Sequence, residues 1–163
     1  MSLLKTQMLA ALMLCVAAPR AWSQVTDKKT ISLEGAKAVA AAAAAEARRG
    51  SEGGSIAVVD DGGNLIYVER LEPTFPASAD IAIHKARTAA LFQRPSKVLE
   101  DAISSGRTSL LKVAEAPLQG GEPIRVNGVI VGAIGVSGAA SAARDEAIAL
   151  VGAGALAATT SNR

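Results

Sequence analysis

His84 and Tyr67 are the side chains of this sequence best suited to binding a transition metal or a haem iron. The 163-residue chain contains one His and one Tyr, and both residue types serve as axial ligands of haem. Asp80 and Thr88 lie four residues either side of His84, so on a helix one of them could fix the tautomer of its imidazole. His84 is therefore the sharpest candidate for a metal ligand. The alternative is a histidine on the flank of a helix that pairs with Asp80 and binds nothing.

A glycine-rich stretch, residues 120–145, offers backbone donors for an anionic ligand. Its sequence, GGEPIRVNGVIVGAIGVSGAASAARD, predicts a loop, two strands and the start of a helix. A helix start leaves backbone N–H groups free, which suits a haem propionate or a small organic acid. Arg87 or Arg125 could add a bidentate guanidinium. The candidate positions are Gly120, Gly121, Pro123, Ser137 and Gly138. The alternative is that these glycines only serve tight turns.

The alternative function for the same region is enzymatic: acid/base catalysis on a small carboxylate. Lys85, Glu122 and Asp145 are the groups that an isomerisation or an imine hydrolysis would use. The sequence contains no Gly-x-Ser-x-Gly elbow, no P-loop and no His pair for zinc. Ser137 lies in Gly-Val-Ser-Gly, but a catalytic triad would need His84 beside it. Whether the protein catalyses a reaction stays open at this point.

Residues 1–23 are predicted to be a cleaved signal peptide. Lys5 supplies the positive charge, Met8 to Ala18 a short apolar run, and Ala21-Trp22-Ser23 a cleavage site. We therefore expect a mature protein that begins at Gln24, is periplasmic or secreted, and does not insert into the membrane. Every Met, Cys and Trp precedes that residue, which excludes cysteine catalysis, Cys-based metal sites and methionine ligation of haem.

The composition of the chain indicates one domain, residues 24–163, with a small-residue core. Aromatic residues make up 2% of the sequence and the net charge is +2. Neither a stacking platform nor a basic run is present, so we expect no nucleic-acid partner. A core of Ala, Val, Ile and Leu buries little area per side chain. We therefore expect a homo-oligomer.

The N-terminal half is predicted to form a helix followed by a β-hairpin. Ser32 is the predicted N-cap of a helix that ends near Gly50, with small residues along one face. Strands are predicted at Ser55 to Asp60 and Asn64 to Arg70. Asp60 and Asp61 lie in the turn between them, where they are better suited to accepting backbone hydrogen bonds than to binding a metal.

The C-terminal half is predicted to form helices followed by a second β-hairpin. Ser78 is the predicted cap of a helix from Ala79 to Phe92. A short helix is predicted at residues 96–105, and a short helical or irregular piece at residues 109–114. The remaining elements are strands at residues 124–126 and 129–136, an Asn127-Gly128 turn between them, and a helix at residues 140–156. Hairpin connections predict an α+β fold with an antiparallel sheet of about five strands, flanked by helices.

Several motifs together resemble one family. VVDDGGNLIYVER, KARTAALF, GGEPI and IVGAIGVSGA follow one another in this order. They resemble the GlcG/HbpS-like family, also called DUF336 or the haem-degrading domain, and are similar to the C-terminal domain of PduO-type corrinoid adenosyltransferases. The resemblance spans about Ile31 to Ala157.

The resemblance implies a fold, a ligand and partners. The fold would be a profilin-like or roadblock-like α-β-α sandwich. The protein would bind haem, form a homo-oligomer and be able to act as the partner of a membrane sensor. The family pattern KA-x-TA is matched by Lys85, Ala86, Thr88 and Ala89, so Lys85 and Thr88 are implied site positions. His84 precedes the pattern and is suggested by its chemistry alone. The expected pocket is formed by the helix at residues 79–92, the GGEP loop and the GVSG turn.

Overall fold

The computed structural model describes residues 26–159, so the predicted signal peptide lies outside the described residues. In chain order the elements are α2 (Leu33–Arg49), β1 (Gly54–Asp60), β2 (Leu65–Leu71), α3 (Ser78–Phe92), α4 (Ser96–Ser104), the 3-10 helix η1 (Thr108–Lys112), β3 (Gly121–Val126), β4 (Val129–Ser137) and α5 (Ala142–Thr159). Within this part of the chain, no helix combines the length and the apolar composition that a membrane span requires.

The sheet is antiparallel and has four strands in the order β2-β1-β4-β3. The α+β prediction is confirmed, but the expectation of about five strands is wrong. The four strands correspond to the four whose positions the sequence predicts, and residues 26–159 contain no further strand. Ile31 donates one backbone hydrogen bond to Val131, at 2.8 Å, without extending the sheet.

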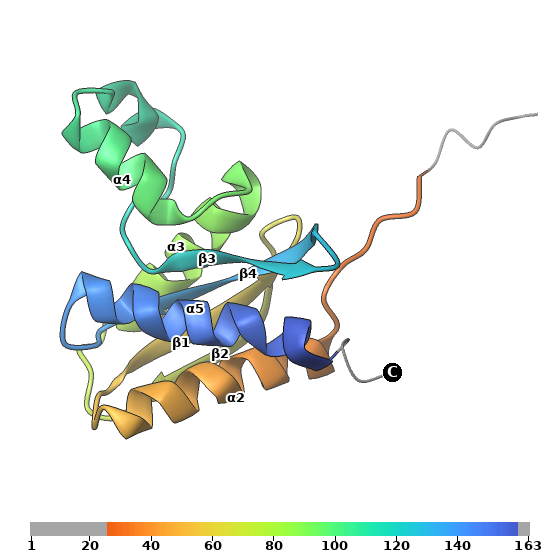
Figure 1. Ribbon diagram of the computed structural model, residues 1–163. Coiled ribbons are helices and arrows are strands. Elements are labelled where there is room, and N and C mark those ends of the chain that lie inside the picture. The colour runs from red at the N-terminus through yellow and green to blue at the C-terminus, as the bar shows by residue number, and fades with distance from the viewer. Residues whose placement is uncertain (1–25, 160–163) are drawn as a thin grey trace, which may run out of the picture.

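Helices cover both faces of this sheet (Figure 1). α2 and α5 lie on one face, over a core of Ile, Val, Leu and Ala. On the other face α3 packs on β1, β4 and β3 through small residues. A Cβ atom on Gly135 would lie 2.0 Å from the carbonyl oxygen of Ala82. The glycine therefore lets the α3 backbone rest directly on β4.

The two hairpins form as the turn residues predict. Asn127 and Gly128 have φ values of 51° and 79°, the left-handed region that a two-residue hairpin turn requires. In the first hairpin, Asp60 Oδ1 accepts hydrogen bonds from the backbone N–H groups of Gly62 and Asn64, both at 2.8 Å. Asp60 is thus a turn former, as its position in the sequence indicated.

The start of α3 differs from the prediction. Ser78 is the first helical residue instead of the cap, and Ala77 in the cap position makes no side-chain cap hydrogen bond. The Ser78 hydroxyl is buried and lies 2.7 Å from the Ser55 hydroxyl. This buried pair ties the helix start to β1. Beyond the end of α3, α4 and η1 form a small unit beside the β3 edge of the sheet (Figure 1).

Candidate functional site

His84 lies in a groove of about 410 Å³ between α3 and the unit formed by α4 and η1. We call it the His84 groove. Aliphatic side chains supply most of its walls, and two glutamates and a serine complete it. The lining residues are Ile81, His84, Glu100, Ile103, Ser104, Leu111, Glu115, Ala116, Pro117 and Leu118. The predicted helix thus contributes to the groove, whereas the GGEP loop and the GVSG turn do not line it.

The His84 imidazole is accessible and faces an acid that the sequence analysis did not identify. Its side chain is 47% exposed, and Nε2 lies 3.8 Å from Glu115 Oε2. The other carboxylate oxygen of Glu115 lies 3.1 Å from Arg87 Nη2. Glu115 occupies a loop without periodicity, so no pattern in the sequence pointed to it. The partner of His84 is therefore Glu115 instead of Asp80.

Lys85 is buried and points away from the groove. Its Nζ lies 2.8 Å from Asp145 Oδ2 and donates to the carbonyl oxygen of Val136 at 2.9 Å. Asp145 Oδ1 accepts from the backbone N–H of Ala139 at 3.0 Å. These contacts connect α3, β4 and the start of α5. Both charges have partners within the fold, so the two side chains act as a structural lock.

Thr88 also has an internal role. The residue is 1% exposed. Its hydroxyl accepts a hydrogen bond from the Ala116 N–H at 3.1 Å. Ala116 belongs to the loop that lines the His84 groove. Thr88 therefore positions a wall of the groove without facing into it.

The backbone donors of the GVSG turn are engaged by the protein's own carboxylates. Asp145 binds the N–H of Ala139, and Glu52 Oε1 lies 3.4 Å from the N–H of Ala140. The Arg144 guanidinium hydrogen-bonds Glu52 and holds the pKa of that carboxyl below its usual range. The backbone donors at this helix start thus bind carboxylates of the protein itself.

The glycines and small residues of the predicted site serve close packing. Gly120 has a φ of 116°, and a Cβ atom there would lie 2.9 Å from Asp145 Cβ. A Cβ atom on Gly121 would lie 2.3 Å from the Lys85 carbonyl oxygen, and one on Gly138 the same distance from Thr74 Oγ1. These glycines allow close approaches between neighbouring elements. The two remaining members of the group lie in strands: Pro123 pairs with Ala133, and Ser137 with Ser55.

Tyr67 lies apart from His84. It sits on β2 and packs against the core on the α2 face of the sheet, whereas His84 belongs to α3 on the opposite face. Its hydroxyl is 3.5 Å from Glu69 Oε2. Tyr67 and His84 therefore do not form one site.

Glu122 is the acid with the most perturbed proton affinity. It is 5% exposed on β3, and burial, with repulsion from Glu146 as the smaller cause, raises its pKa to about 7. Glu146 accepts a hydrogen bond from Gln119 Nε2 at 2.7 Å. Among residues 26–159, no three His, Cys, Asp or Glu side chains gather closely enough to hold a metal ion. Glu122 is thus a candidate for proton exchange.

Comparison with known proteins gives matches over most of the chain. The family model described as haem degrading protein HbpS-like matches residues 31–154. Protein GlcG of Escherichia coli K12 is 41% identical over 111 residues, which make up 68% of this chain and 83% of GlcG. A double mutant of Streptomyces reticuli HbpS has a TM-score of 0.76 and 34% identity, and the match covers 82% of this chain and 92% of HbpS. A PduOC:heme complex has the same fold, with a TM-score of 0.69 and 24% identity over 77% of this chain and 94% of PduOC.

Proposed function

The chain belongs to the HbpS-like family, and on this premise we propose that it binds haem in the His84 groove, with His84 as the iron ligand. One observation carries the proposal: the single His of the sequence projects, half-exposed, into an apolar groove on the surface. The description of the family model as haem-degrading supports the choice of ligand.

The residues of the groove fit haem in chemical terms. Ile81, Ile103 and Leu111 offer apolar surface for a macrocycle, and an imidazole is a common axial ligand. Arg87 lies beside the groove, paired with Glu115, and could receive a propionate. Bound haem iron would supply redox reactivity, including slow peroxide-driven degradation of the haem itself. The protein's own part is to hold and to shield the group.

A haemin titration of the protein beginning at Gln24 tests this proposal. We expect a saturable shift of the Soret band in the wild type and in Tyr67→Phe, and its loss in His84→Ala. Tyr67→Phe is the matched control because that residue lies on the opposite face of the sheet. Circular dichroism of each variant checks that the fold is retained. A Soret shift that survives His84→Ala would remove His84 as the ligand, and no shift in the wild type would refute haem binding.

A second candidate function, acid/base chemistry on a small organic acid, is favoured by Glu122. A carboxyl with a pKa of about 7 can give and take a proton near neutrality. Lys85 and Asp145 are less suited, because each neutralises the other inside the fold. Thermal stabilisation by small carboxylates that Glu122→Gln abolishes, without any haem binding, would favour this function over the first.

Export and self-association complete the proposal. The predicted signal peptide at residues 1–23 supports a periplasmic or secreted location. Leu111 and Val113 are 59% and 65% exposed near the groove, which supports a partner surface there. A membrane sensor as partner rests on the family resemblance alone. Sedimentation of the Gln24-starting protein measures the oligomeric state directly.

A further inference from the structure

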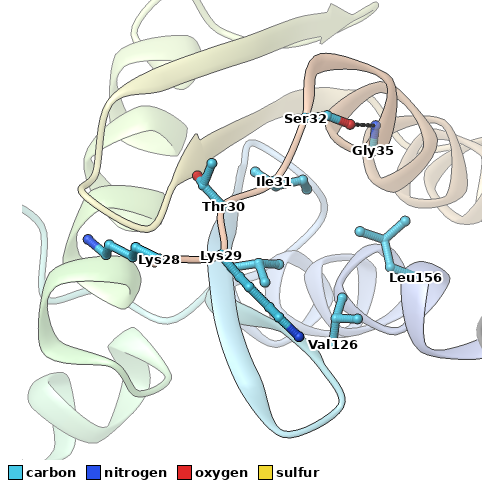
Figure 2. A pocket seen from close by; sticks show the side chains of 9 residues that line it. Lys28, Lys29, Thr30, Ile31, Ser32, Gly35, Val126 and Leu156 are labelled. Carbon is cyan, nitrogen blue, oxygen red and sulfur yellow. Dashed lines mark hydrogen bonds between the residues drawn. The ribbon is translucent and has the colours of Figure 1, made fainter. Parts of the chain in front are cut away.

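A second cavity lies between the residues that lead into α2, the β3–β4 hairpin and the end of α5. Its volume is about 610 Å³, within the range of small-molecule sites. Figure 2 shows its lining, which shares no residue with the His84 groove. We call it the Lys29 cavity.

The floor of the Lys29 cavity is fixed and apolar. Ile31 and Val131 are each 5% exposed, and a backbone hydrogen bond of 2.8 Å joins them. Two glycines make room for the Ile31 side chain: Cβ atoms on Gly35 and Gly132 would lie 3.0 and 2.9 Å from it. Val126 and Leu156 add further apolar wall. The floor is therefore preformed.

One positive charge at this cavity has no acidic partner among residues 26–159. Lys28 is paired with Asp61, and this ion pair lowers the pKa of the Asp61 carboxyl. The next residue, Lys29, makes no ion pair or side-chain hydrogen bond within residues 26–159. Figure 2 shows its side chain extended along the cavity with its ammonium group towards Val126. The chain is anchored on both sides of Lys29, at Lys28 and at Ile31, so the backbone position of Lys29 beside the apolar floor is defined.

We propose that the Lys29 cavity binds a medium-chain aliphatic carboxylate. Its carboxylate would pair with the Lys29 ammonium, and its chain would cover Ile31, Val126, Val131 and Leu156. An apolar floor next to a cation is complementary to an anion that carries an apolar chain, because the chain is buried against the floor and the anion pairs with the ammonium. This ligand site is separate from the proposed haem site and does not depend on it.

Calorimetric titration with octanoate, octan-1-ol and acetate tests the two halves of the cavity separately. We expect octanoate to bind saturably, and octan-1-ol, which lacks the charge, and acetate, which lacks the chain, to bind at least about tenfold more weakly. Lys29→Ala should weaken octanoate binding about tenfold, and Lys29→Arg should retain it. Leu156→Trp should abolish binding by filling the cavity. Lys112→Ala, which removes an exposed lysine of η1, is the matched control and should bind as the wild type does.

Three results would overturn the proposal. The first is the absence of octanoate binding, and the second is binding that Lys29→Ala and Leu156→Trp leave unchanged. The third is binding that appears only in a chain shortened to Thr159, since the protein's own C-terminal residues would then occupy the cavity. Haemin titration of Lys29→Ala and octanoate titration of His84→Ala keep this proposal distinguishable from haem binding. Lys29→Ala should bind haemin, and His84→Ala should bind octanoate, as tightly as the wild type does.

Discussion

Replacing Lys85 tests whether the family's KA-x-TA pattern encodes a scaffold or a ligand site. In Lys85→Ala the Asp145 carboxylate, whose side chain is 8% exposed, loses its cation and keeps only the Ala139 N–H. The Val136 carbonyl oxygen also loses its donor. Breaking a buried ion pair by removing one partner costs about 3–5 kcal/mol.

That cost is large for a domain of this size. Small domains have a total unfolding free energy of about 5–15 kcal/mol, so Lys85→Ala should lose about a fifth or more of it. The corresponding fall in Tm is about 10–15 °C. Urea unfolding followed by far-UV circular dichroism measures the change, and Lys37→Ala is a matched control, because that lysine has an exposed partner on its own helix.

A double variant separates the two interpretations. Lys85→Met combined with Asp145→Leu replaces the ion pair by apolar groups and should recover part of the lost stability, since the Val136 carbonyl and the Ala139 N–H still lack these partners. The scaffold interpretation also expects the double variant to bind haemin as the wild type does. A Lys85→Ala protein of unchanged stability that fails to bind ligand would refute the reasoning and make Lys85 a ligand residue.

Three further predictions concern the buried polar and close-packed positions. Because the folded-state pKa of Glu122 is raised to about 7 by burial and by Glu146, above about 4.3 in the unfolded chain, ionisation opposes folding. Stability should therefore fall as pH rises from about 4 to 7 and then level off, and Glu122→Gln should flatten this fall in urea unfolding series. Gly135→Ala should prevent folding into this structure, judged by soluble yield and circular dichroism, because its Cβ atom would overlap the α3 backbone. Thr88→Val should cost about 1–3 kcal/mol by leaving the buried Ala116 N–H without its acceptor, measured by urea unfolding.

Local signals in the sequence predicted most of the fold. The Asn127-Gly128 turn, the Asp60 turn and the Ser32 cap each depend on residues within four positions of one another, and each is confirmed. Ser78 failed as a cap because its hydroxyl pairs with Ser55, which lies 23 residues away. The expectation of about five strands was wrong because the hairpin signals located four strands and no local signal placed a fifth.

The candidate site was harder to predict because it is made by long-range contacts. His84 was found from composition, since the sequence contains a single His. The contact with Glu115 and the groove around His84 both depend on how α4 and η1 pack against α3. The periodicity of the sequence does not predict this long-range packing. The engagement of the GVSG turn by Asp145 and Glu52 likewise requires pairings across the fold.

The positions that match the KA-x-TA motif and the GGEPI motif build the scaffold of this protein. Lys85 locks α3 to β4 and α5, Thr88 holds the loop above the groove, and Gly121 lets β3 approach α3. The groove itself is lined by residues outside that pattern, among them His84 and Glu115. A family pattern of this kind can persist while the groove changes, since altering the groove residues leaves the lock intact. Family membership therefore predicts the architecture of this protein more firmly than its ligand, and the haemin titration of His84→Ala addresses what membership alone does not decide.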